Sequence, residues 1–219
     1  MTSNTVSFLA LGDSYTIGES VDATLRWPVQ LAQALQREGI PTREPVIIAQ
    51  TGWTTKELAG GIEEAGLSGA YDLVSLLIGV NNQYRGRALE EYRHQFLDLL
   101  SQAIGFAGGD PQRVVVLSIP DWSVTPFAEG RDREQIGGEI DAFNRVCRNE
   151  SEGVGVWYLD LTGISREAAT DPSLVAEDGL HPSVTMYALW AEAALPVAME
   201  ILSPDPGDAR TNSIHEPVS

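Results

Sequence analysis

Cysteine is nearly absent from this chain of 219 residues, in which Cys147 is the single copy. One cysteine cannot form an internal disulfide, so the fold has to be stabilised by a hydrophobic core. Cys147 follows Ile136, Ile140 and Phe143 at helical spacing, which predicts a buried structural thiol. With no cysteine cluster and no paired histidines at ligand spacing, we expect no metal site.

Positive charge is also scarce. The chain has 14 Lys and Arg residues against 31 Asp and Glu residues, a formal net charge of -17. Such a surface repels phosphate backbones and anionic membranes, so neither nucleic acid nor a membrane is an expected partner. The sequence shows no signal peptide and no stretch that approaches the roughly 18 apolar residues of a membrane span. We therefore expect a cytoplasmic protein whose partner is a small molecule.

Only three histidines are present, and two of them are poor candidates for chemistry. His94 lies off the apolar face of a predicted helix, and His215 lies in the C-terminal tail. His181 is the remaining candidate for a catalytic base. No glycine-rich phosphate loop is present, so no cofactor is expected.

The patterning that is present predicts one α/β domain over residues 1–202. Five short apolar runs read as buried strands, and amphipathic segments between them read as helices. The expected strands cover residues 6–11, 46–49, 72–78, 113–119 and 156–160. This alternation predicts a three-layer α/β/α sandwich around a five-stranded parallel sheet, a flavodoxin-like arrangement. Residues 203–219 are expected to form a disordered tail.

Four short motifs follow the predicted strands or lie in the last loop. A serine just past a strand's carboxyl end lies where open α/β sheets bind their ligands. Each motif is weak by itself, but the four occur in order and each in a suitable structural place. Together they resemble the SGNH hydrolase superfamily, also called GDSL esterases and lipases. The motifs are Gly12-Asp13-Ser14, Gly52, Gly79-Val80-Asn81-Asn82 and Asp178-Gly179-Leu180-His181-Pro182.

The resemblance implies a role for each matching residue. Ser14 matches the nucleophile, His181 the general base and Asp178 the third member of the triad. The backbone N–H of Gly52 and the side-chain amide of Asn81 match the donors of the oxyanion hole, with the Ser14 N–H as a third. The chemistry fits these residue types, because a serine hydroxyl needs a base to activate it and a carboxylate orients that base. Neutral N–H donors stabilise the developing oxyanion.

The chain departs from the family pattern at two positions. Tyr15 stands where the GDSL name has leucine, and Asn82 stands where the third motif usually ends in aspartate. We expect Asn82 to brace its loop rather than take part in chemistry, and Asp13 to brace the turn before Ser14.

Three aromatic residues have two possible roles. Trp53, Trp122 and Phe127 are either packing residues or the lining of a pocket for the acyl or leaving group. Residues 120–133 follow a predicted strand and are too many for a minimal connection, so we expect this segment to wall the pocket.

The sequence thus favours a serine esterase that hydrolyses a carboxylic ester, with a short acyl chain, through an acyl-enzyme. Alternatives within the family are a carbohydrate O-deacetylase and a lysophospholipase or thioesterase. A non-catalytic module that binds a sugar or small molecule is the alternative of another class. A flavodoxin-like cofactor binder is more distant, because Asp13 would lie beside the cofactor's phosphate.

Overall fold

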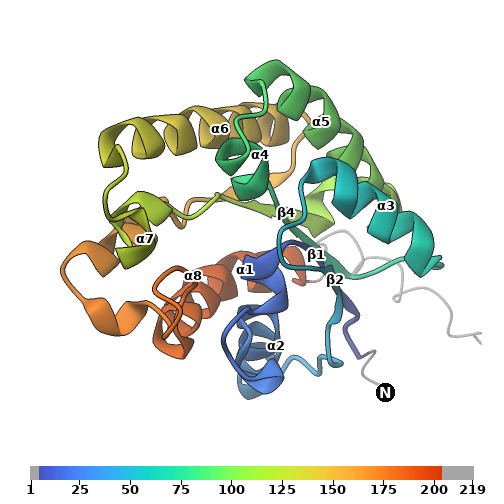
Figure 1. The fold of residues 1–219 in the computed structure, drawn as a ribbon. Helices are drawn as coiled ribbons and strands as arrows, with labels where there is room; N and C mark the ends of the chain where they lie inside the picture. The colour runs from blue at the N-terminus through green and yellow to red at the C-terminus, as the bar shows by residue number, and fades with distance from the viewer. Residues whose placement is uncertain (1–4, 204–219) are drawn as a thin grey trace, which may run out of the picture.

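The computed structural model describes residues 5–203, so most of the predicted tail lies outside the described residues. Five parallel strands form one sheet in the order β2-β1-β3-β4-β5, which confirms the predicted sheet (Figure 1). β1 and β3 are buried along their whole length, as their continuous apolar runs require. The strands are β1 (Phe8–Gly12), β2 (Val46–Ala49), β3 (Leu73–Leu77), β4 (Val114–Leu117) and β5 (Trp157–Leu159).

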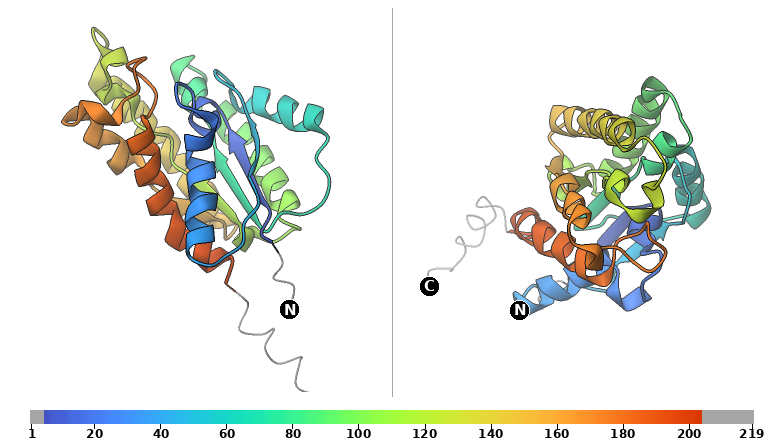
Figure 2. Two further views of the ribbon diagram at one scale, coloured as in Figure 1. Left: turned by 90° about the horizontal axis from the view of Figure 1, so that it is seen from below. Right: turned by 60° about the vertical axis from the view of Figure 1, so that its left-hand side comes forward.

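Helices cover both faces of the sheet and complete the predicted three layers (Figures 1 and 2). One face is covered by α2 (Trp27–Arg37) and α8 (Val184–Ile201). The other is covered by α3 (Thr55–Ala65), α5 (Leu89–Phe106) and α6 (Arg133–Gly153). Three short helices follow strands β1, β3 and β5: α1 (Ser14–Ile17), α4 (Val80–Tyr84) and α7 (Thr162–Arg166). Single 3-10 turns include η3 (Trp122–Val124) and η4 (Pro126–Ala128).

Helix α8 corrects one expectation from the sequence. Its 18 residues have a mean hydropathy of 1.2, so by length and composition it could cross a membrane. The expectation that no stretch approaches such a length is therefore wrong. In the structure α8 packs against α2 and β5, and about a third of its residues are buried there. Its buried residues are Met186, Tyr187, Trp190, Ala191, Ala194 and Ala198.

Cys147 lies in the core, as its helical spacing predicted. The residue is buried on α6, and its sulfur lies 2.8 Å from the Tyr92 hydroxyl. Burial raises the pKa of the Cys147 thiol to about 12. The thiol is therefore protonated at neutral pH and has a structural role.

The carboxyl ends of β1, β2 and β3 meet at one edge of the sheet, where the strand order reverses. Gly12 is paired with Ala49 on one side and with Leu77 on the other. The segments that follow these three strands therefore begin side by side, at the place where open α/β sheets bind ligands. A Cβ at Gly12 would lie 2.2 Å from Thr16 Oγ1 and 2.6 Å from the Leu77 carbonyl, so the turn requires glycine there.

Candidate active site

A single pocket of about 160 Å³ brings four of the five predicted site residues together. Ser14 comes from the start of α1, just after β1, Gly52 from the loop after β2, Asn81 from α4, just after β3, and His181 from the loop before α8. Asp178 contacts the imidazole of His181. Ser14 and His181, which are 167 positions apart in the chain, thus meet at one end of the sheet.

Ser14 is the first residue of α1 and is almost fully buried. Asp13 precedes it as the helix N-cap, and its Oδ1 accepts a hydrogen bond of 3.1 Å from the Tyr15 N–H. Asp13 therefore braces the turn, as expected. Burial raises the pKa of Asp13 to about 7, although the hydrogen bond from Tyr15 acts in the opposite direction.

Asp178 holds His181 through both its oxygens. Its Oδ2 lies 2.6 Å from His181 Nδ1, and its Oδ1 accepts hydrogen bonds of 2.9 Å from the backbone N–H groups of Leu180 and His181. Ser20 Oγ donates to Oδ2 at 2.6 Å. Partial burial alone would raise the pKa of Asp178, but the hydrogen bonds from Ser20, His181 and Leu180 hold that pKa well below its usual range. The carboxylate is therefore ionised at neutral pH.

This contact fixes which imidazole nitrogen is available for chemistry. Nδ1 of His181 faces Asp178, which leaves Nε2 for the Ser14 hydroxyl in the shared pocket. Within residues 5–203, no direct hydrogen bond joins Ser14 to His181. Catalytic hydrogen bonds often tighten only when substrate is bound. Backbone hydrogen bonds hold the loop itself, among them one from the Phe127 N–H to the Gly179 carbonyl at 2.9 Å and one from the Ala176 N–H to the His181 carbonyl at 2.7 Å.

Three residues that carry N–H donors line the pocket together with His181. In the described part of the chain, the backbone N–H groups of Ser14 and Gly52 have no hydrogen-bond acceptor. Asn81 Nδ2 donates to the Trp53 carbonyl at 2.9 Å, which orients the amide and leaves its second hydrogen for a ligand. Gly52 has φ of 85°, a conformation that favours glycine. The pocket lining thus includes all three residues to which the family resemblance assigns the oxyanion-hole donors.

Asn82 braces its loop, as predicted. Its side chain is buried, and its Oδ1 accepts from the Thr55 N–H at 3.0 Å while its Nδ2 donates to Thr55 Oγ1 at 2.8 Å. The amide thus ties the short helix α4, which follows β3, to the first turn of α3. An asparagine supplies the donor that an aspartate at this position would lack.

Aromatic side chains from two segments form one wall of the pocket. Tyr84, Trp122 and Phe127 all line it, with the Trp122 ring 5.6 Å from the Tyr84 ring and 5.8 Å from the Phe127 ring. Residues 120–133 therefore wall the pocket as predicted. Trp53 does not line it: a Cβ at Gly61 of α3 would lie 2.1 Å from the Trp53 ring, which packs on that helix.

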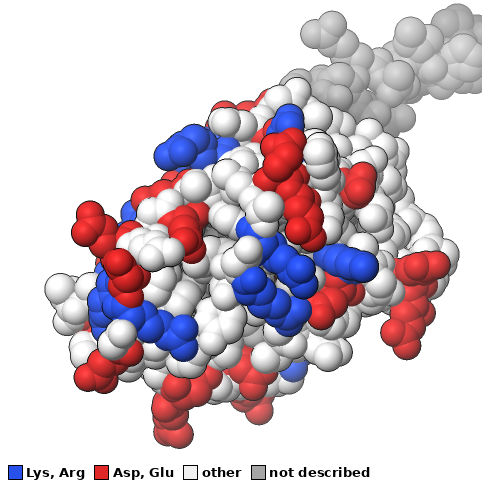
Figure 3. Space-filling view, turned by 45° about the horizontal axis from the view of Figure 1, so that its top comes forward, with Lys and Arg blue, Asp and Glu red and all other residues white. Residues whose placement is uncertain are grey.

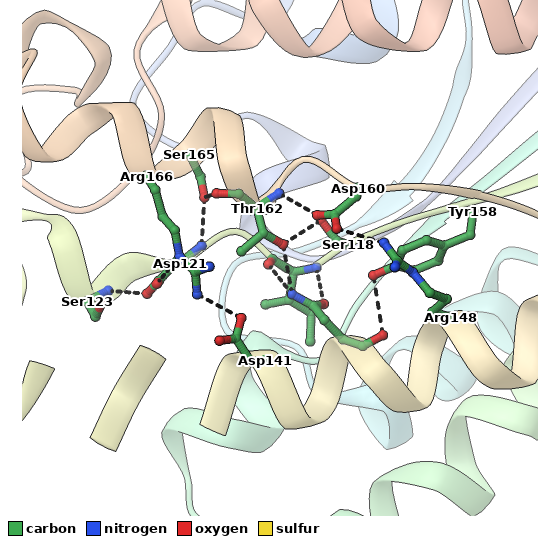
Figure 4. Close-up of polar contacts among 12 residues, drawn as sticks. Ser118, Asp121, Ser123, Asp141, Arg148, Tyr158, Asp160, Thr162, Ser165 and Arg166 are labelled. Carbon is green, nitrogen blue, oxygen red and sulfur yellow. Dashed lines mark hydrogen bonds and ion pairs between the residues drawn. The ribbon is translucent and has the colours of Figure 1, made fainter. Parts of the chain in front are cut away.

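A polar network anchors the base of this wall (Figure 4). Asp121 is buried, and its N–H donates to Ser165 Oγ at 2.9 Å. Its carboxylate accepts from the Ser123 N–H at 2.9 Å and from Arg166 Nε at 2.8 Å. Arg166 also pairs with Asp141 at 2.7 Å, so the start of the wall is tied to both α6 and α7. Arginine is suited to such double pairing because its donors form a fixed planar fork.

Sequence reasoning missed two residues that position the site. Ser20 holds Asp178 from a loop and has φ of 65°, a rare conformation for a residue with a side chain. Arg85 reaches the Gly52 carbonyl from the end of α4. Arg85 lies four residues after Asn81, and this spacing is the one signal in the sequence that could have pointed to it.

Within residues 5–203, no three His, Cys, Asp or Glu side chains are grouped so as to hold a metal ion.

Comparisons with known proteins identify the family of this chain. The sequence matches the GDSL-like Lipase/Acylhydrolase family over residues 10–189, and the chain belongs to that family. A carboxylic ester hydrolase is the class of enzyme that this membership supports.

Individual relatives are similar over most of the chain. An acetylxylan esterase from Geobacillus stearothermophilus is 27% identical over 195 residues, which cover 86% of this chain and 82% of that protein. The structure of Axe2, an acetylxylan esterase from the same organism, has a TM-score of 0.68 at 23% identity, covering 90% of this chain and 96% of that one. The structure of TesA has a TM-score of 0.68 at 19% identity and covers 90% of this chain and 99% of that one. These structures share the fold described above.

Proposed function

We propose that this protein is a serine esterase that hydrolyses a carboxylic ester through an acyl-enzyme. The observation that carries the proposal is the 2.6 Å contact between His181 Nδ1 and Asp178, made beside the pocket that holds Ser14. A base oriented by a carboxylate next to a serine is the arrangement needed to activate a hydroxyl nucleophile.

In the proposed reaction, Ser14 Oγ attacks the ester carbonyl carbon and transfers its proton to His181 Nε2. The resulting oxyanion accepts hydrogen bonds from the N–H groups of Ser14 and Gly52 and from the Asn81 amide. His181 then protonates the departing alcohol, which leaves Ser14 acylated. Water, deprotonated by His181, attacks the acyl-enzyme, and the acid departs as Ser14 regains its proton. Asp178 stays ionised throughout and stabilises the imidazolium.

Pocket size supports a short acyl chain. A space of about 160 Å³, bounded by Trp122 and Phe127, suits an acetyl or similarly small group beside Ser14. The second candidate substrate class is an O-acetylated carbohydrate, because a relative that is 27% identical over most of the chain is an acetylxylan esterase.

The experiment is a rate comparison on 4-nitrophenyl acetate, butyrate and octanoate, alongside acetylated xylo-oligosaccharides and a lysophospholipid. The proposal expects kcat/KM to fall as the acyl chain lengthens and the Ser14→Ala variant to be inactive on every ester. Hydrolysis of the octanoate faster than the acetate would contradict the short-chain assignment. Activity retained by Ser14→Ala would contradict the mechanism itself.

A further inference from the structure

The aromatic wall of the pocket carries a cation that the mechanism does not use. The guanidinium carbon of Arg131 lies 4.8 Å from the centre of the Phe127 ring and 5.5 Å from those of Tyr84 and Trp122. Arginine on an aromatic face is attracted by the ring electrons and presents its N–H donors at its edges. The three rings therefore hold Arg131 in place without occupying its hydrogen bonds.

Arg131 lies at the mouth of the pocket. Tyr84 and Phe127 are the pocket-lining rings that are most exposed, at 48% and 37%, while Trp122 is buried at 4%. The exposed rings mark the opening, and Arg131 contacts both of them. A substrate held at Ser14 that is larger than the pocket has to project past this opening.

The guanidinium of Arg131 is unpaired within the described residues. Arg85 and Arg166 are paired with carboxylates, whereas no carboxylate of residues 5–203 lies within ion-pair distance of Arg131. Its side chain also makes no hydrogen bond to a described residue. Because the chain has a net charge of -17, an exposed arginine is expected to be paired with one of the chain's own Asp or Glu side chains. Basic side chains are also gathered in groups on the face drawn in Figure 3, between acidic ones.

From these contacts we propose that Arg131 binds a carboxylate on the alcohol portion of the ester, so that the enzyme prefers esters whose alcohol portion carries a carboxylate group. This proposal rests on the function proposed above, because it assigns the acyl group to the inner pocket and the alcohol to the mouth. The edge of the guanidinium can bind a carboxylate through two parallel hydrogen bonds. The surrounding acidic surface makes such a local cation selective, since a substrate carboxylate is repelled elsewhere.

The test compares two aryl acetates that differ in charge: 4-acetoxybenzoate and its neutral methyl ester. The ratio of their kcat/KM values, carboxylate over neutral, is expected to fall about fivefold in Arg131→Gln, which corresponds to a partly exposed ion pair. Arg131→Lys keeps the positive charge but not the planar fork of N–H donors. Its kcat/KM ratio is therefore expected to lie between those of the wild type and Arg131→Gln. Arg145→Gln is the matched control, because it removes one exposed positive charge from α6 in a separate groove. Its ratio is expected to equal that of the wild type.

A binding measurement separates this proposal from the proposed mechanism. Calorimetry with the uncleaved esters on a Ser14→Ala background needs no turnover, and the carboxylate ester is expected to bind more weakly once Arg131→Gln is added. An unchanged ratio and unchanged binding would overturn the proposal while leaving the esterase function intact. An equal loss on both esters would overturn it too, because Arg131 would then only support the aromatic wall. An equal change in Arg145→Gln would show a general field effect and would also overturn it.

Discussion

Arg85 Nη2 donates a hydrogen bond of 2.5 Å to the carbonyl of Gly52 and so ties two walls of the pocket together. The same guanidinium pairs with Glu57 at 3.1 Å, and Glu57 accepts from the Thr54 N–H at 2.7 Å. Glycine at φ of 85° has wide conformational freedom, so this clamp limits the motion of the loop that carries the Gly52 N–H. Because Arg85 caps the helix that begins with Val80 and Asn81, it also links the two proposed oxyanion donors, Gly52 and Asn81.

Loss of the clamp is expected to slow the chemical step. Arg85→Met is expected to lower kcat by roughly tenfold with KM nearly unchanged, because the misplaced donor serves the transition state. Arg85→Lys is expected to restore part of the rate. Arg87→Met, which removes an exposed arginine two residues further on, is the matched control. Steady-state kinetics on 4-nitrophenyl acetate measure both parameters, and a rise in KM at constant kcat would show that Arg85 binds substrate instead.

Asn81 and Asn82 are neighbours with different expected effects. Asn81→Ala removes an oxyanion donor and is expected to lower kcat by about 10² to 10³ with little change in KM. Asn82→Ala breaks two buried hydrogen bonds to Thr55 and is expected to lower the melting temperature with a smaller loss of kcat. Kinetics on one aryl acetate, with thermal melts, distinguish the two. A larger kcat loss in Asn82→Ala would reverse these assignments.

The aromatic wall is expected to set selectivity. Phe127→Ala enlarges the mouth of the pocket, and Trp122→Ala enlarges its interior and also removes the hydrogen bond to Gln83. Both variants are expected to raise the relative rate on butyrate over acetate. Trp122→Ala is also expected to lower stability by roughly 3 kcal/mol because that ring is buried. Selectivity equal to the wild type in both variants would place the acyl site elsewhere.

The buried carboxyl of Asp13 predicts a pH dependence of stability. Its pKa is raised from 3.8 to about 7, so the folded state binds a proton that the unfolded state has lost. This contribution to the free energy of unfolding is complete below pH 3.8 and is lost as the pH rises through about 7. Between about pH 5 and about pH 7 the loss amounts to roughly 2 kcal/mol.

Asp13→Asn removes this titration while keeping an acceptor for the Tyr15 N–H. Its stability relative to the wild type is therefore expected to improve as the pH rises over that interval. Urea denaturation of both proteins at the two pH values measures the difference. Parallel changes in the two proteins would show that Asp13 stays ionised in the folded state.

Much of the fold followed from the sequence because strand and helix patterns are local. All five strands begin and end within two residues of their predicted ranges, since continuous apolar runs mark strands buried on both faces. The short helices α1 and α4 were expected as turns and loops, because four or five residues are too few to show a helical period.

The site followed from the sequence only where a motif carried it. Ser14, Gly52, Asn81 and His181 meet because their strands end at one edge of the sheet. The contact of Ser20 with Asp178 joins positions 158 residues apart, so no local pattern contains it. Arg131 was missed for the same reason: two of its three aromatic contacts belong to its own segment, but nothing in the sequence folds that segment onto Tyr84.

The most direct test of the central claim is to identify the residue that a fluorophosphonate ester labels. The reagent reacts with a serine only where a base activates the hydroxyl and donors stabilise the resulting anion. Peptide mass spectrometry of the labelled protein is expected to find the phosphonyl group on Ser14, with labelling and esterase activity lost in parallel in Ser14→Ala and in His181→Ala. Label on a different serine, or label on Ser14 that persists in His181→Ala at the wild-type rate, would contradict the account.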